Sequence, residues 1–534
     1  MPRTANQPPP LEEYDLYGEN RALVEAVARE GATWADDELR VFGRALGAEP
    51  LEWGRLANEN PPRLRTHDRF GERIDQVEFH PAWHELLSLG VSHALHAAPW
   101  RDPRPGAHVA RAAAFVTLAQ VEAGVGCPLS MTFAAVPTLR AEPALSAEWE
   151  PLLTSTTYDP ALRLASEKGG ALCGMAMTER QGGSDVRANE TQARPLAEDE
   201  ATLHGHKWFC SAPMCDAFLV LAQAPAGLTC YLLPRVLPDG KCNAFRIERL
   251  KDKLGNRSNA SAEIALDGAW ARRLGEEDRG VATIIEMVVH TRLDCVLGSA
   301  GLMRRAVAEA THHAAHRFAF GRPLVEQPLM TSVLADLCVD SEAATVLALR
   351  LARAYDEDDV AFRRLATAIA KYWICKTTPP LVAEALECIG GNGYVEESAL
   401  PRLFRESPLN SIWEGAGNVQ ALDVLRTLER RPESLAAVLD EITLAAGADG
   451  RLDSALVELR SELADADDAE LRARRLVERL ALCLQGSILI RCDSPVADAF
   501  CATRLAGEGG RAYGTLPRGI ELDAIVARHT PRMR

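Results

Sequence analysis

Residues 175–186 read MAMTERQGGSDV, a short apolar run that leads directly into a loop of glycine and hydroxyl residues. Glycines expose backbone N–H groups without a Cβ in the way, so such a loop suits a pyrophosphate or the edge of a flat ring system. A plain glycine-rich hairpin explains the same residues, and short glycine motifs often arise by chance. Taken alone the stretch favours the hairpin, so the rest of the chain has to decide between the two.

The loop lies in a part of the chain that predicts β-structure. Short runs bounded by turn residues predict strands at 203–209, 217–222, 228–233 and 261–266. No helical spacing interrupts residues 171–272. We therefore expect a central β domain that forms an antiparallel barrel or sandwich rather than a parallel sheet.

Helical spacing precedes and follows the β domain. Trp83, Leu87 and Val91 recur every four residues inside a predicted helical N-terminal domain, residues 1–170. A predicted helical bundle covers residues 273–430. Its long amphipathic helices are expected at 281–316, 328–356, 359–389 and 413–429.

Residues 431–534 continue the helical pattern and predict an extra C-terminal helical domain, with a polar loop at 461–470. The predicted fold class is therefore α+β. It consists of a helical N-terminal domain, a central antiparallel β barrel, a C-terminal helical bundle and the extra helical domain.

Composition narrows the class of protein further. The 534 residues carry a net charge of −16, which argues against a general nucleic-acid coat protein but leaves room for a local basic patch. The 13 cysteines include no C-x-x-C pair, so zinc ribbons and thioredoxin-type sites are excluded. The start of the chain is rich in proline and has no apolar signal-peptide core, and its uncharged runs are too short and interrupted to span a membrane. We expect a cytoplasmic protein with reduced cysteines.

Two further motifs could contact a cofactor. Residues 316–324 read HRFAFGRPL, where an arginine could bind a phosphate in bidentate fashion or could simply complement the dipole of a helix end. Residues 389–394 read IGGNGY, and a helix cap explains one of these glycines but not all three. The related string at 391–396 follows a helix rather than a strand, so it fails as a dinucleotide fingerprint.

A fourth motif at 411–418 reads SIWEGAGN and contains a lone carboxylate, Glu414. Desolvation by Ile412 and Trp413 would raise the pKa of this carboxyl toward a range useful for a general base. The alternative is a glutamate at a helix start that favours the helix dipole. His312, His313 and His316 have helical ligand spacing but no third ligand nearby, so no metal site is predicted.

The four motifs together, in this order and on this architecture, resemble the acyl-CoA dehydrogenase superfamily over about residues 80–430. Longer strings resemble its AidB branch of adaptive-response flavoproteins. These strings are TERQGGSDVRANET at 178–191, HKWF at 206–209, RLKDKLGNRSN at 249–259 and IWEG at 412–415.

The resemblance implies non-covalent FAD between the β domain and the bundle, in a protein that is typically tetrameric. In many relatives Arg317 and Phe320 would reach FAD across a subunit interface. The positions that match the family's cofactor site are Met175, Thr178, Gly183, Ser184, Phe209, Ser211, Arg317, Phe320, Gly390, Gly391 and Asn418.

The resemblance also implies that Glu414 removes the α-proton of an acyl-CoA thioester while the flavin takes the β-hydride. Many members have threonine where this chain has Ala416, and AidB-type proteins are expected to be weak dehydrogenases of isovaleryl-CoA-like substrates. An ordinary acyl-CoA dehydrogenase or oxidase of short branched acyl-CoA metabolism, without DNA binding, is the alternative.

AidB-type proteins are further expected to bind double-stranded DNA through the C-terminal region and to act in the response to alkylation damage. Residues 432–534 hold 13 arginines, no lysine and 17 acidic residues, so the region is not basic overall. The positions assigned to DNA are Arg426, Arg511 and Arg518. The alternative is a solvated helix face with ordinary ion pairs, such as Arg475 with Glu478.

Overall fold

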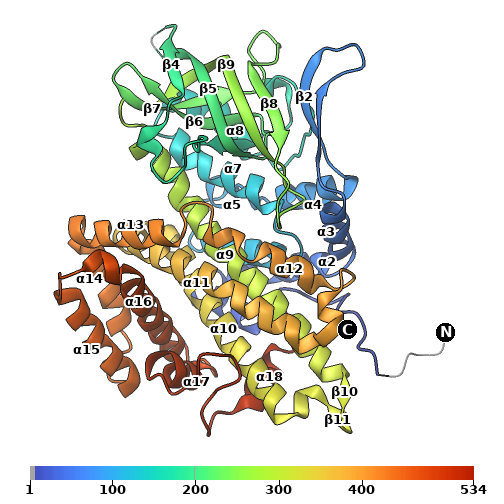
Figure 1. Ribbon diagram of the computed structural model, residues 1–534, viewed down its shortest axis with the longest axis vertical. Coiled ribbons are helices and arrows are strands. Elements are labelled where there is room, and N and C mark those ends of the chain that lie inside the picture. The colour runs from blue at the N-terminus through green and yellow to red at the C-terminus, as the bar shows by residue number, and fades with distance from the viewer. Residues whose placement is uncertain (1–5, 198, 534) are drawn as a thin grey trace. The chain divides into compact units, whose positions relative to one another are not determined.

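The computed structural model describes residues 6–197 and 199–533, which fold into two compact units (Figure 1). Each unit is assembled from separate parts of the chain. The β unit comprises Glu52–Pro103 and Glu122–Thr291, and the helical unit comprises the chain up to Leu51, Arg104–Val121, and the chain from Arg292 onward.

The β unit combines helices of the N-terminal region with all the strands that are longer than two residues. Its helices are most of α3 (Glu49–Glu59), α4 (Pro81–Ser92), α5 (Ala98–Arg101), α7 (Gly126–Leu139) and α8 (Pro143–Leu153). Its strands are β1 (Arg63–His67), β2 (Arg73–Glu78), β3 (Cys173–Ala176), β4 (Gln192–Pro195), β5 (Glu200–Ser211), β6 (Ala217–Ala224), β7 (Gly227–Pro234), β8 (Phe245–Leu250) and β9 (Ser261–Leu274).

Strands β4, β5, β6, β7 and β9 pair in a closed ring, and β3 and β8 extend it, so the expected barrel is confirmed. Most pairs are antiparallel, but β3 runs parallel to β6, with Met175 opposite Leu219. The chain reaches β6 only after the long loop and the β4–β5 hairpin, and this connection allows β6 to return in the direction of β3. The barrel is therefore mixed rather than wholly antiparallel.

The helical unit contains the bundle and the C-terminal helices. Helix α9 (Gly280–His316) enters it from the β unit, and α10 (Pro328–Asp356) and α11 (Val360–Ile389) pack against each other at its centre. The other helices are α1 (Arg21–Arg29), α2 (Asp36–Leu46), α6 (Ala107–Ala119), α12 (Ala399–Glu406), α13 (Gly417–Arg430), α14 (Pro432–Thr443), α15 (Gly450–Ala464), α16 (Ala469–Arg491), α17 (Ala497–Phe500) and α18 (Leu522–His529).

The C-terminal helices are continuous with the bundle core. Helix α16 contacts α10, α11 and α13, and α18 packs on α10, as Figure 1 shows for the orange and red helices beside the yellow ones. The apolar face of α16, which includes Leu480 and Leu484, is buried. Removing this region would expose the bundle to water.

Three sequence expectations were wrong in detail. Residues 63–78 form the β1–β2 hairpin inside the expected helical region, because the Asp68 side chain accepts hydrogen bonds from Phe70 N and Glu72 N and closes a tight turn. Helix α13 starts at Gly417 rather than at 413. The polar loop covers only residues 465–468, since α15 and α16 extend into the charged stretch with polar side chains facing solvent.

No helix within the described ranges is long and apolar enough to cross a membrane. The described residues also contain no group of three or more His, Cys, Asp or Glu side chains that could hold a metal ion. His312 and His316 instead bond to backbone oxygens, those of Pro9 and His312.

Candidate active site

The glycine-rich loop after β3 is anchored by a buried ion pair. Lys207 Nζ lies 2.6 Å from Glu179 Oε1, and both side chains are fully buried. Burial alone would raise the pKa of Glu179, but the adjacent Lys207 charge holds it well below its usual range. The same carboxylate accepts hydrogen bonds from the backbone N–H groups of Glu190 and Thr191. One charged pair therefore fixes both ends of the loop on strand β5.

The loop between these anchors is open to solvent. Gly182 has a φ of +141° and no neighbour where a Cβ would stand, whereas a Cβ on Gly183 would meet Thr178 Oγ1 at 2.4 Å. The backbone carbonyl oxygen of Thr178 accepts a hydrogen bond from Trp208 N at 2.9 Å. Thr178, Gly183 and the strand that carries Phe209 are thus brought together.

Phe209 is the exposed aromatic of this group, with 53% of its surface accessible. Lys251 Nζ lies 4.5 Å from the centre of its ring. Ser211, two residues on along β5, pairs with Ser261 of β9 and is half-buried. Ser184 is exposed in the loop, and Met175 is buried within β3. The β unit therefore presents an aromatic face, hydroxyl groups and an unobstructed backbone.

Glu414 has an unusual backbone in the helical unit. Its φ is +56°, in the left-handed region that side chains other than glycine rarely adopt, and Gly415 follows with φ +100°. Such a conformation costs on the order of 1–3 kcal/mol and persists only where surrounding contacts enforce it. Glu414 therefore lies in a loop before α13, not at a helix start as one interpretation of the sequence had it.

Three side chains enforce this conformation by binding the carbonyl groups around Glu414. Lys371 Nζ donates to the oxygens of Trp413 and Gly415, at 2.8 and 2.5 Å. Arg292 Nε donates to the oxygen of Glu414 itself at 3.0 Å, and Gln420 Nε2 donates to it at 2.9 Å. We call Lys371, Arg292 and Gln420 the backbone clamp.

The clamp is built from buried charge. Lys371 is only 1% exposed, and burial lowers its pKa. Arg292 is held in turn by Asp423 at 2.7 Å, which also binds Arg364. Burial would raise the pKa of Asp423, but Arg364 and Arg292 together lower it. These residues could not be found from the sequence, because α9, α11 and α13 bring them together only in the folded chain.

The surroundings of Glu414 differ from those expected. Ile412 is 60% exposed, so in the single chain it does not provide the desolvation that the sequence suggested. Trp413 is half-buried, and its Nε1 donates to Asn410 Oδ1 at 2.9 Å. Asn418 is exposed in the first turn of α13, close along the chain to Glu414.

The arginine motif forms a hairpin after α9. β10 (Phe318–Ala319) and β11 (Arg322–Pro323) pair around a turn in which Phe320 and Gly321 both have positive φ, +51° and +86°. Phe320 projects from this turn and is 97% exposed. Arg317 is half-buried and hydrogen bonds to the carbonyl of Asn6.

The glycine motif forms a short 3₁₀ turn, η5 (Gly390–Tyr394), after α11. Gly390 has φ +70°, and neither it nor Gly391 has a neighbour where a Cβ would stand. Asn6 bonds to Phe318, and Gln7 bonds to Asn392. Residues 6–7 therefore link the hairpin and the glycine turn, which lie together at the opposite end of the unit from α13 (Figure 1).

These residues fit a flavin nucleotide in two respects. The β unit offers an exposed aromatic ring beside hydroxyl groups, and Gly182, Gly390 and Gly391 have no neighbour where a Cβ would stand, so their backbone is open to a ligand. In addition, Gln420 Oε1 is buried beside the Glu414 loop without a hydrogen-bond partner in the described chain. A buried acceptor of this kind is normally satisfied, and a donor group of a ligand would do so.

Most arginines of the C-terminal region are used within the helical unit. Arg491, Arg504 and Arg528 pair with Glu441, Asp336 and Glu342. The expected pair of Arg475 with Glu478 was wrong. Arg475 binds Glu462 at 2.5 Å, because α15 packs against α16 and supplies a partner from across the helix pair.

Arg426, Arg511 and Arg518 are exposed. Arg426 lies on α13, and the other two lie in the segment between the π-helical turn Cys501–Leu505 and α18. Figure 1 shows this segment away from α13, so the structure does not gather the three into one patch.

Comparisons with known proteins give a consistent family. The adaptive response protein AidB N-terminal domain matches residues 6–160, the acyl-CoA dehydrogenase middle domain matches 174–269, and the acyl-CoA dehydrogenase C-terminal domain matches 278–429.

Two relatives match most of the chain. The protein AidB of Escherichia coli (strain K12) is 48% identical, with 95% of this chain and 94% of that protein covered. Acyl-CoA dehydrogenase family member 11 of Caenorhabditis elegans is 33% identical, with 86% and 81% covered.

Solved structures agree with these relatives. The crystal structure of Caenorhabditis elegans ACDH-11 in complex with C11-CoA is similar with a TM-score of 0.86 and 28% identity, covering 99% of this chain and 93% of that one. The chain therefore belongs to the AidB branch of the acyl-CoA dehydrogenase family, whose members are FAD-dependent flavoproteins that oxidise CH–CH bonds.

Proposed function

We propose that this protein oxidises an acyl-CoA thioester between its α and β carbons and that Glu414 is the base. The observation that carries the proposal is the left-handed backbone of Glu414, held by the clamp through three consecutive carbonyl groups. Strained backbone that is enforced by its surroundings is typical of catalytic positions. The similarity to a relative crystallised with C11-CoA supports a thioester as the substrate class.

The chain's own residues would bind and orient the substrate and move one proton. A carboxylate oxygen of Glu414 accepts the α-proton, and Lys371, Arg292 and Gln420 keep its backbone in the conformation that aims the side chain. FAD, when bound, supplies the acceptor for the hydride that leaves the β carbon. Holding the base and the substrate in a reactive geometry lowers the barrier to proton transfer, because the entropy cost of aligning them is already met on binding.

Thr178, Gly183, Ser184, Phe209 and Ser211, together with Met175, are the proposed cofactor residues of the β unit. In the helical unit these are Arg317, Phe320, Gly390, Gly391 and Asn418. The near-complete exposure of Phe320 supports a site completed by another copy of the chain, as in a tetramer. The domain boundaries at 170, 272 and 430 and the cytoplasmic location stay predictions.

The activity is expected to be weak, with short branched, isovaleryl-CoA-like thioesters as the substrates to try first. Ala416 is the residue that caps the start of α13, and it has no hydroxyl to bond to the helix or to a cofactor. Anaerobic addition of such thioesters should bleach the flavin. Rapid reoxidation of the reduced flavin by oxygen would instead identify an oxidase, the alternative within the family.

A second function, binding of double-stranded DNA in the response to alkylation damage, is favoured by one observation. Arg426, Arg511 and Arg518 are exposed, whereas arginines of the C-terminal region such as Arg491, Arg504 and Arg528 are bound within the unit. Exposed guanidinium groups suit contacts to phosphate oxygens. Binding to duplex DNA that weakens steeply with salt tests this function, independently of flavin chemistry.

A further inference from the structure

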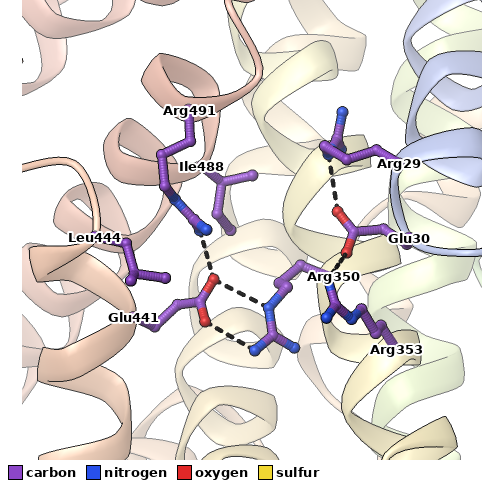
Figure 2. A pocket seen from close by; sticks show the side chains of 8 residues that line it. All are labelled: Arg29, Glu30, Arg350, Arg353, Glu441, Leu444, Ile488 and Arg491. Atoms are coloured by element: carbon purple, nitrogen blue, oxygen red, sulfur yellow. Dashed lines mark hydrogen bonds and ion pairs between the residues drawn. The ribbon is translucent and has the colours of Figure 1, made fainter.

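A cavity of about 160 Å³ lies in the helical unit among α1, α10, α14 and α16 (Figure 2). Its lining contains four arginines and two glutamates beside the apolar side chains of Leu444 and Ile488. The charged residues are Arg29, Glu30, Arg350, Arg353, Glu441 and Arg491. None of them belongs to the proposed active site or to the proposed DNA contacts.

The charged side chains form two groups that face each other across the cavity (Figure 2). On one side Glu441 is bound by Arg350 at 2.8 Å and by Arg491 at 2.5 Å. On the other side Glu30 is bound by Arg29 at 2.8 Å and by Arg353 at 3.6 Å. Each carboxylate is thus shared between two guanidinium groups, which leaves each group with one surplus positive charge.

The surplus positive charge of the two groups is only partly balanced by a carboxylate outside the cavity. Arg353 also binds Glu357 at 2.8 Å, on the exposed side of α10. With Glu357 included, four cations face three carboxylates. The side chains of Arg350 and Glu441 are only 11% and 8% exposed, so bulk water screens this excess charge weakly.

Two guanidinium nitrogens in the lining lack an acceptor. Arg29 Nη2 and Arg350 Nη1 are buried without a hydrogen-bond partner among the residues that the structure describes. Arg350 already uses its other two nitrogens on Glu441, and its third nitrogen points away from that carboxylate, toward the Glu30 side (Figure 2). An unpaired buried donor, above all a charged one, is costly to leave unsatisfied.

We propose that this cavity binds a phosphate-type oxyanion, with the unpaired guanidinium nitrogens of Arg29 and Arg350 as its donors. Guanidinium groups match the oxygens of such ions, and a tetrahedral anion can accept from two walls at once. A cavity volume of roughly 10–15 Å³ is enough to hold one water, so a volume of about 160 Å³ accommodates an oxyanion with accompanying water. The side chains of Arg353, Arg29 and Arg491 are partly exposed and leave the site open to entry.

The test is a titration of the flavin-loaded protein with inorganic phosphate at constant ionic strength. Calorimetry measures the binding, and the midpoint of thermal unfolding measures the stabilisation. Chloride serves as the reference anion. We expect saturable binding of phosphate that raises the unfolding midpoint, and at least about tenfold weaker binding in Arg29→Gln and in Arg350→Gln. Arg479→Gln, which removes a surface arginine of α16 that pairs with Glu458 and Glu462, should bind phosphate as the wild type does.

Phosphate that acts no differently from chloride would overturn the proposal, and so would binding that both Arg29→Gln and Arg350→Gln retain. Arg29→Gln keeps the pair of Glu30 with Arg353 and is the variant less prone to unfold. Competition experiments with adenosine 3′,5′-bisphosphate and with a short DNA duplex identify the source of the phosphate group. Competition by either supports the site, and binding of phosphate alone supports a free oxyanion.

Discussion

Lys371 Nζ donates hydrogen bonds to the carbonyl oxygens of Trp413 and Gly415, so one buried ammonium group holds the peptides on both sides of Glu414. Burial lowers the pKa of Lys371, and the nearby charge of Glu414 acts in the opposite direction and favours the ammonium form. The position of the proposed base therefore depends on a residue that is remote from it in sequence.

Lys371→Met should slow substrate-dependent flavin bleaching by about tenfold to a hundredfold while FAD stays bound, because the carboxylate loses its fixed position. Stopped-flow bleaching at saturating thioester measures this step separately from substrate affinity. Lys371→Arg should restore part of the rate, since it can donate to both carbonyls. A rate in Lys371→Met equal to that of the wild type would show that the clamp does not position Glu414.

Gly415→Ala should destabilise the loop by about 1 kcal/mol or more, because φ +100° is unfavourable for alanine and the new Cβ would meet Gln420 Nε2 at 2.6 Å. Urea unfolding measures the loss. Gly417→Ala is a suitable control, since its nearest contact is the flexible end of Lys376 at 3.3 Å and its φ is not in the left-handed region. Equal stability of the two variants would contradict the assigned strain.

The Glu179–Lys207 pair should make stability depend on pH. Lys207 lowers the pKa of Glu179 in the folded state below the value of about 4.3 that glutamate has when unfolded. Stabilisation from a lowered carboxyl pKa is fully present above the unfolded pKa and is lost as the pH falls through the folded pKa. The free energy of unfolding should therefore decrease as the pH is lowered from about 5.

Glu179→Gln should remove this part of the pH dependence and should cost about 3 kcal/mol at neutral pH, because it leaves Lys207 buried without its counter-charge. The double variant Glu179→Gln, Lys207→Met should recover part of the lost free energy of unfolding, because no unpaired charge stays buried. Urea unfolding between acid and neutral pH provides the comparison. An unchanged slope in Glu179→Gln would assign the acid sensitivity to other carboxylates.

Phe320→Ser should weaken both subunit association and flavin retention if the exposed hairpin completes the site of another copy. Analytical ultracentrifugation and the ratio of flavin to protein after gel filtration report the two effects. Phe70→Ser, at another exposed aromatic in the turn of the β1–β2 hairpin, is the matched control. Retention of both properties in Phe320→Ser would leave the hairpin without a role in assembly.

The triple variant Arg426→Ala, Arg511→Ala, Arg518→Ala should weaken DNA binding and flatten its dependence on salt. Each lost phosphate contact lowers the slope of log affinity against log salt by roughly 0.9. Point variants are preferable to deletion of residues 432–534, because that region packs on α10, α11 and α13. Arg479→Ala controls for loss of charge, and equal salt slopes in all proteins would rule out these three contacts.

The order of helical and β regions and the family could be predicted from the sequence, because apolar spacing and the strings of the four motifs are local features. The sequence missed the β1–β2 hairpin, whose strands are too short for a clear alternation. It also began the last bundle helix at 413 and left a helix-start position open as the alternative for Glu414, whereas the structure holds Glu414 in a left-handed loop before α13.

The clamp could not be predicted in the same way. Lys371 and Arg292 lie on different helices, 79 positions apart in the chain, and neither stands in a recognisable motif. Long-range contacts of this kind arise only from packing, and the same holds for the pairing of Arg475 with Glu462. Charged residues in long helices predict solvated faces from sequence, and folding decides which of them become buried.

The most direct test of the account compares the wild type with Glu414→Gln in an anaerobic titration of the bound flavin with short branched acyl-CoA thioesters. The substitution keeps the shape of the side chain and leaves the clamp on the backbone carbonyl groups in place, but it removes the base. We predict bleaching of the wild-type flavin and a rate at least about a hundredfold lower in Glu414→Gln, with thioester binding retained. Bleaching at the wild-type rate in Glu414→Gln would contradict the assignment of Glu414 as the base.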